Sequence, residues 1–184
     1  LPLYLFSWKI APALAAGNCV IAKPSEVTPV TAFLLSQVCQ EAGLPSGVLN
    51  IVHGSGEHCG QNIVAHPSIK AISFTGGTNT GQHIARTAAP MFKKLSLELG
   101  GKNPNLVFED CDYEKMLKTT LKSSFANQGQ ICLCGSRIYV EESIFDKFKN
   151  DFVAATKKLI VGDPKNPNTD LGALVSQAHL EKVY

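Results

Sequence analysis

The sequence has little net charge and no long apolar run. Its 17 lysine and arginine residues are balanced by 15 aspartate and glutamate residues, which gives a formal net charge of +2. No basic stretch concentrates this charge, and nucleic-acid recognition depends on such a stretch, so we expect no nucleic-acid partner. No apolar segment reaches the length of a bilayer span, so we expect no membrane contact either.

Cysteine is too sparse for a disulfide scaffold. The chain has 6 cysteines in 184 residues, fewer than a disulfide-rich secreted protein uses. We therefore predict a cytoplasmic protein in which one or two thiols serve chemistry. The apolar start imitates a signal peptide, but it lacks an initiator Met and a basic region, and Lys9 interrupts it, so we reject that interpretation. Both ends fall within helical patterns, so we expect an internal piece of a larger protein.

Short β-branched segments alternate with amphipathic helical patterns, which is typical of an α/β fold with a mostly parallel sheet. We expect strands at residues 18–23, 48–52, 71–74, 95–99, 105–108 and 137–140. We expect helices at residues 2–16, 29–43, 57–65, 80–88, 113–127, 143–159 and 176–184, with Thr28 and Ser143 capping two of them. The glycine pair Gly100 and Gly101 marks a boundary between domains at 1–101 and 102–184.

Two glycine-rich loops follow predicted strands. Residues 54–60 have the sequence GSGEHCG, and residues 75–81 have the sequence TGGTNTG. Glycine lets the backbone turn sharply and lets a phosphate approach the N–H groups at the start of a helix. Neither loop matches the dinucleotide fingerprint or the P-loop, and each alone is equally compatible with an ordinary strand-to-helix connection. Because both lie at the carboxyl ends of strands, together they favour a nucleotide site.

A cation and a carboxylate, Lys23 and Glu26, follow the first predicted strand and are separated by Pro24 and Ser25. A carboxylate at this edge of a parallel sheet can accept hydrogen bonds from an adenosine ribose and would repel a 2′-phosphate. The alternative is a solvated turn that leads into the next helix.

The segment 125–137, FANQGQICLCGSR, contains two cysteines among small and polar residues. Backbone N–H groups at a helix end can stabilise a thiolate, so Cys132 and Cys134 are candidates for chemistry. A metal site is disfavoured because no second cysteine pair and no histidine pair has ligand spacing. The candidate base is Glu98, at the end of an apolar strand, where partial desolvation suits a general base. We interpret Asn103 as a turn residue.

These residues resemble the NAD(P)-dependent aldehyde dehydrogenase superfamily. Residues 97–102, LELGGK, match the glutamate signature of that family, and residues 125–132 match its cysteine signature, Phe-x-x-x-Gly-Gln-x-Cys. The segment 23–26, Gly56 in the first glycine loop and residues 74–76 at the second occur along the chain in the order that the family's coenzyme domain has. Residues 93–104, 124–134 and 176–183 are most similar to the branch of 2-aminomuconic semialdehyde dehydrogenases, which includes enzymes described as acting on retinal.

The resemblance implies a Rossmann-like parallel sheet in a coenzyme domain, joined to the start of an α/β catalytic domain. It implies that an aldehyde is oxidised to a carboxylic acid with NAD: Cys132 forms a thiohemiacetal and then a thioester, and Glu98 activates the hydrolytic water. It assigns coenzyme binding to Lys23, Pro24, Ser25, Glu26, Gly56, Thr75, Gly76, Gly77, Gly81 and Leu99. The partners that it implies are a small aldehyde and, for the full-length parent, further copies in a homodimer or homotetramer; it implies no metal.

The sequence also departs from the family pattern. Cys134 stands where the family has a small residue, and Gly77 replaces a Ser that contacts the coenzyme, so we expect a weaker pyrophosphate contact. The family's oxyanion Asn would immediately precede Leu1, so we expect little or no turnover from this chain alone. Two other functions stay open: a non-catalytic dinucleotide-binding or structural protein, and a redox-sensing pair of Cys132 and Cys134, whose spacing strains a disulfide.

Overall fold

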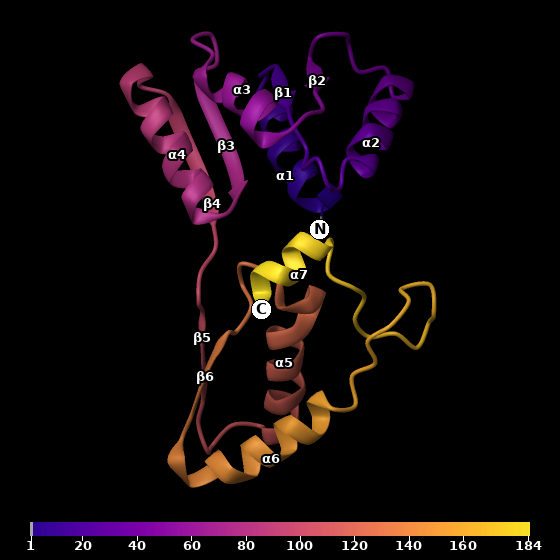
Figure 1. Cartoon of the computed structure of the whole chain (residues 1–184), viewed down its shortest axis with the longest axis vertical. Helices are drawn as coiled ribbons and strands as arrows, with labels where there is room; N and C mark the ends of the chain where they lie inside the picture. The colour runs from indigo at the N-terminus through magenta and orange to yellow at the C-terminus, as the bar shows by residue number, and fades with distance from the viewer. Residues whose placement is uncertain (1) are drawn as a thin grey trace. The chain divides into compact units, whose positions relative to one another are not determined.

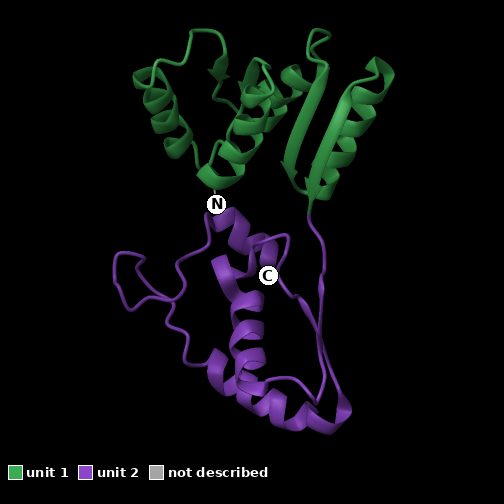
Figure 2. Cartoon of the chain, turned by 180° about the vertical axis from the view of Figure 1, so that it is seen from behind, with its two compact units in different colours: residues 1–99 green, residues 100–184 purple. Residues whose placement is uncertain are grey.

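The computed structural model describes residues 2–184 and contains two compact units, Leu1–Leu99 and Gly100–Tyr184 (Figure 2). Both units combine helices with pairs of parallel strands (Figure 1), which confirms the predicted α/β class. Within residues 2–184, every helix is too short or too polar to cross a membrane.

Unit 1 alternates strands with helices. In chain order it contains α1 (Pro2–Ala15), β1 (Val20–Ala22), α2 (Val30–Glu41), β2 (Leu49–Ile51), a short π-helix (Gly56–Gly60), α3 (Gln61–Ala65), β3 (Ala71–Gly76), α4 (Thr78–Ala88), a 3₁₀ turn (Ala89–Met91) and β4 (Lys94–Leu99). Strand β1 pairs with β2, and β3 pairs with β4, both in parallel. Among the described residues these four strands form two separate pairs. Strands β1 and β2 have three residues each, which leaves few backbone groups to pair with a further strand.

Helix α4 packs closely on β4 because a glycine lies at their contact. Gly81 is buried, and a Cβ atom on it would lie 2.6 Å from Cδ2 of Leu99. Ile84 and Ala88, one and two turns later on α4, are also buried. The same helix that begins at the second glycine loop is therefore fixed against the strand that carries Glu98.

Unit 2 is built around one parallel strand pair and the helix that connects its strands. It contains β5 (Pro104–Val107), α5 (Tyr113–Phe125), a 3₁₀ turn (Ala126–Gly129), β6 (Arg137–Val140), a second 3₁₀ turn (Glu142–Ile144), α6 (Phe145–Thr156) and α7 (Gln177–Val183). Aromatic rings join α5 to α6: the centroids of Phe125 and Phe152 lie 5.9 Å apart, and those of Phe148 and Phe152 lie 5.3 Å apart. The Tyr113 hydroxyl adds a hydrogen bond to Asp151 Oδ2 at 2.8 Å.

Both predicted helix caps are wrong. Helix α2 begins after Pro29 without a side-chain cap, and the backbone N–H of Thr28 donates to the carbonyl of Ser25 at 3.2 Å. Helix α6 follows a 3₁₀ turn, and the hydroxyl of Ser143 instead donates to Oε2 of Glu109 at 2.8 Å. A bond to a carboxylate is stronger than one to a neutral acceptor, so the serine is drawn away from the helix end.

Lys93 is an unusual buried cation in unit 1. It is 8% exposed, and its Nζ donates to the carbonyls of Val64 and His66, both at 2.6 Å. These carbonyls lie at the end of α3, whose last carbonyl groups have no partner within the helix. The lysine thus satisfies the end of α3 from the segment that precedes β4.

We predict that Lys93→Met lowers the free energy of unfolding by about 1–3 kcal/mol, because it removes two charged hydrogen bonds and leaves the His66 carbonyl with only the N–H of Ile69. Urea denaturation measures this difference. Lys94→Met is the matched control, since Lys94 is exposed and its ammonium has no hydrogen-bond partner among residues 2–184. Equal effects of the two substitutions would contradict the role of the buried ammonium.

Candidate active site

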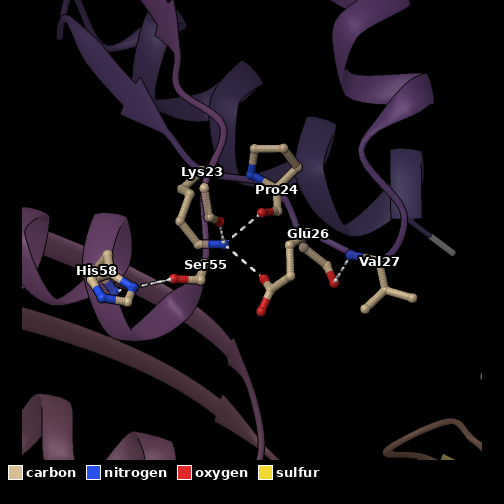
Figure 3. A network of polar contacts seen from close by, with 8 residues as sticks. Lys23, Pro24, Glu26, Val27, Ser55 and His58 are labelled. Carbon is tan, nitrogen blue, oxygen red and sulfur yellow. Dashed lines mark hydrogen bonds and ion pairs between the residues drawn. The ribbon is translucent and has the colours of Figure 1, made fainter.

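The end of β1 holds a fixed lysine beside a carboxylate. The Nζ of Lys23 donates to the carbonyl of Pro24 at 2.7 Å and to that of Gly54 at 3.1 Å, and it pairs with Oε2 of Glu26 at 3.2 Å (Figure 3). The side chain of Lys23 is 16% exposed, whereas that of Glu26 is 51% exposed. The backbone N–H of Glu26 and then the Lys23 ammonium lower the pKa of this carboxyl, so Glu26 is a ready anionic acceptor.

The first glycine loop is ordered by its own side chains. The hydroxyl of Ser55 accepts from the backbone N–H of His58 at 3.3 Å and lies 2.9 Å from its Nδ1 (Figure 3). This cap starts the π-helix Gly56–Gly60, a form that recurs at functional sites. Gly56 is exposed, and a Cβ atom on it would meet only open space.

A mostly apolar hollow of about 380 Å³ opens beside Glu26. It is lined by Pro24, Glu26, Pro29, Val30, Phe33, His53 and Gly54. Apolar walls therefore adjoin an exposed carboxylate that can accept hydrogen bonds.

The second glycine loop leaves polar groups free. Within residues 2–184, Thr75 Oγ1 is the one buried side-chain oxygen or nitrogen without a hydrogen-bond partner. Helix α4 begins after Gly77 without a side-chain cap, so backbone N–H groups of its first turn remain available. A Cβ atom on Gly77 would meet open space, whereas Gly76 lies against the ring of Phe74. Donors for an anion therefore gather at this loop.

Glu98 is the neighbour of Thr75 on the β3–β4 ladder. Glu98 is exposed in this chain. The prediction that its position on an apolar strand partly desolvates the carboxylate is therefore wrong for this chain. The adjacent residues Leu97 and Leu99 are half-buried, because alternate residues of a strand face opposite sides.

Lys9 lies beside β3 and close enough to Glu98 to be affected by its charge, and the sequence alone did not identify it as a site residue. Its Nζ donates to Oγ of Ser73 on β3 at 2.9 Å. Burial lowers the pKa of Lys9, and the negative charge of Glu98 partly opposes this shift. The sequence feature that could have identified Lys9 is its position as a lysine in an otherwise apolar helix.

The cysteine loop turns sharply after α5. Asn127 and Gln128 have φ angles of 51° and 58°, and Gly129 has a φ angle of 70°. The left-handed region is costly for residues with a Cβ atom, and such strain gathers at functional sites. After this turn Cys132 is exposed and Cys134 is buried.

Asn103 holds this loop and is the main residue that the sequence interpretation missed. Its side-chain amide donates to the carbonyl of Cys132 at 2.5 Å and to that of Cys134 at 3.1 Å. The other side of the loop is bound to α5, where the N–H of Gly135 donates to the carbonyl of Ser123 at 3.2 Å. The exposed thiol therefore sits on a loop fixed at both sides. The position of Asn103 just before a predicted strand does not indicate that its side chain binds the cysteine loop.

All six cysteines are free thiols, including Cys132 and Cys134. The Sγ of Cys134 points to the carbonyl of Ala126, 3.9 Å away. In the described part of the chain, histidine, cysteine and carboxylate side chains form no group of three that could hold a metal ion.

Comparison with known proteins places these features in a family. The family model described as "Aldehyde dehydrogenase family" matches residues 1–184. The 2-aminomuconic semialdehyde dehydrogenase of Mus musculus is 56% identical over 183 residues, which are 100% of this chain and 38% of that protein. The 2-hydroxymuconic semialdehyde dehydrogenase of Pseudomonas putida is 50% identical over 184 residues, again 38% of its length.

The solved structures that resemble this chain are also aldehyde dehydrogenases. A betaine aldehyde dehydrogenase of Staphylococcus aureus in complex with NAD⁺ superposes with a TM-score of 0.94 at 41% identity, covering 96% of this chain and 35% of that one. The chain spans about 38% of the length of the curated relatives it matches. The resemblance drawn from the glutamate and cysteine signatures is confirmed: this chain belongs to the aldehyde dehydrogenase family.

Proposed function

We propose that the chain carries the coenzyme-binding region and the nucleophile of an NAD-dependent aldehyde dehydrogenase. In this proposal residues 1–101 belong to the coenzyme domain and residues 102–184 to the catalytic domain. The substrate is an aldehyde, a muconic-type semialdehyde or retinal, and the product is its carboxylic acid. The observation that carries the proposal is the exposed thiol of Cys132 on a loop that Asn103 fixes, in a chain with both family signatures.

The residues of unit 1 fit a dinucleotide. Glu26 and the fixed Lys23 would hold the adenosine ribose, with the base in the adjoining apolar hollow. The unpartnered Thr75 hydroxyl and the free N–H groups at the start of α4 suit the pyrophosphate, while Gly77 adds only backbone. When bound, NAD supplies the acceptor for the hydride. Gly56 would contribute exposed backbone for the coenzyme to approach. Gly81 and Leu99 pack against each other, so we assign them a structural role beside the coenzyme site.

The reaction uses two side chains of this chain in turn. The Cys132 thiolate attacks the aldehyde carbon: an S–C bond forms, and the π electron pair of the carbonyl moves to its oxygen, which gives the thiohemiacetal oxyanion. The C–H bond of that carbon would then break with transfer of hydride to bound NAD, and the C=O bond re-forms as a thioester. Glu98 then takes a proton from water, the water oxygen adds to the thioester carbon, and the S–C bond breaks to release the acid and the thiolate. A separate base is needed because the sulfur is bonded to the substrate at this stage.

We further propose a homodimer or homotetramer in the cytoplasm. Apolar side chains on the β5–β6 pair support assembly: Leu106 and Tyr139 are opposite each other in the ladder and are 60% and 53% exposed. Six free thiols suit a reducing compartment.

Cys132→Ser should abolish aldehyde-dependent NADH formation in the complete natural polypeptide, because a hydroxyl at this position is a far weaker nucleophile than a thiolate. NAD binding, measured by calorimetry, should stay unchanged. Cys19→Ser is the control, since Cys19 is also an exposed thiol. Full turnover by the Cys132→Ser protein would remove the assignment of Cys132 as the nucleophile.

Glu98→Gln should give one burst of NADH per active site and then stall, because an amide cannot accept the proton from the hydrolytic water. Stopped-flow absorbance separates the burst from the steady state. Glu114→Gln, at an exposed carboxylate in the first turn of α5, should behave as the unchanged protein. A normal steady-state rate for Glu98→Gln would remove the assignment of the base.

Asn103→Asp should lower kcat by roughly tenfold or more, because two hydrogen bonds of about 1 kcal/mol each are lost and a carboxylate faces two carbonyls. KM for NAD should not change. Asn105→Ala is the control: it removes a bond of Asn105 to Thr120 Oγ1 at 3.1 Å, and so weakens unit 2 without releasing the loop. If both variants lose kcat in proportion to their melting temperatures, Asn103 has a structural role only.

A further inference from the structure

Unit 2 has a second hollow, of about 340 Å³, beside the cysteine loop. It is lined by Thr119, Lys122, Ser123, Ala126, Ile131, Leu133 and Cys134. Its size falls near the lower end of the range of about 300–1,000 Å³ that is usual for small-molecule sites. The wall includes both sequence neighbours of Cys132, Ile131 and Leu133, and Leu133 is 79% exposed. The hollow therefore adjoins the segment that carries Cys132.

The wall combines apolar side chains with one charge. Among the described residues that line the hollow, Lys122 is the only basic residue, and the lining contains no aspartate or glutamate. It lies in the last turn of α5, and its ammonium forms no salt bridge within residues 2–184. An unpaired cation at the rim of an apolar hollow is suited to a chain that ends in a carboxylate.

The chemistry of acid semialdehydes matches this arrangement. A muconic semialdehyde has an aldehyde at one end of a carbon chain and a carboxylate at the other. The relatives at 50–56% identity are named for such compounds. Retinal offers no anion to the lysine, and betaine aldehyde, for which the solved relative is named, carries a positive charge that the lysine repels.

We propose that Lys122 is a specificity-determining residue that pairs with the distal carboxylate of an acid semialdehyde, while the carbon chain lies along the hollow and the aldehyde carbon reaches Cys132. This inference rests on the proposed function of Cys132 and narrows its substrate to acid semialdehydes. The ammonium acts on substrate binding and takes no part in bond making.

The test uses Lys122→Met in the complete natural polypeptide, because Met keeps an unbranched chain and removes the charge. Adipic semialdehyde is the acid probe, hexanal is its neutral counterpart of equal length, and betaine aldehyde is the cationic probe. We expect kcat/KM for adipic semialdehyde to fall about tenfold, as for the loss of one partly screened ion pair. The value for hexanal should change by less than about twofold, and that for betaine aldehyde should not fall.

Two further variants separate a local pairing from other effects. Lys118→Met removes a charge one turn earlier on α5, from an exposed residue outside the lining of the hollow, and should leave the acid preference intact. Lys122→Arg keeps the cation and should keep most of the preference. An unchanged preference in Lys122→Met, an equal loss for hexanal, or the same loss in Lys118→Met would each overturn the proposal.

An alkylation measurement, which needs no aldehyde oxidation, distinguishes the failure of the proposed function from the failure of the proposed role of Lys122. Cys132 is alkylated with anionic iodoacetate or neutral iodoacetamide, and peptide mass spectrometry follows this thiol separately from Cys19. Lys122→Met should lower the iodoacetate-to-iodoacetamide rate ratio at Cys132 alone. If no aldehyde is oxidised, the proposed function fails, and an unchanged ratio then overturns the role of Lys122 as well. Oxidation of all three probes with an unchanged preference overturns only the role of Lys122.

Discussion

Parallel strand pairing is the constraint on which the whole candidate site depends. Because paired strands run in the same direction, the segments that follow them meet at one edge, and the segments that precede them meet at the other. In unit 1 this brings the Lys23 ammonium to within 3.1 Å of the Gly54 carbonyl and sets Thr75 beside Glu98. In unit 2, Asn103 precedes β5 and the cysteine loop precedes β6, so the amide of Asn103 reaches the loop.

The cysteine loop then combines strain with anchoring. Two left-handed residues, Asn127 and Gln128, cost free energy that the surrounding contacts must offset. The bonds from Asn103 and from α5 do so by fixing carbonyl and N–H groups on both sides of the loop. A result of this geometry is that Cys134 is buried while Cys132, two residues earlier, is exposed. One thiol is thereby available for reaction and the other serves packing.

The same loop carries Cys132 and borders the second hollow. The residues on either side of Cys132 form part of the wall of the second hollow, and α5 supplies the rest, including Lys122. Under the proposed function, substitutions at Ile131, Leu133 or Lys122 would alter which aldehyde is accepted and leave Cys132 in place. Family members with one chemical mechanism can differ in substrate for this reason.

The sequence by itself determined the α/β class, the positions of the strands and helices, the family, and the two signature residues Cys132 and Glu98. These follow from local periodicity and from short motifs, which need no knowledge of distant contacts. It did not determine that Thr28 and Ser143 leave their helices uncapped, that Glu98 is exposed, or that Asn103 binds the cysteine loop. Two of these depend on partners far along the chain: Glu109 for Ser143 and the cysteine loop for Asn103. Only the tertiary structure decides them, because a side chain bonds to whichever group the fold brings nearest.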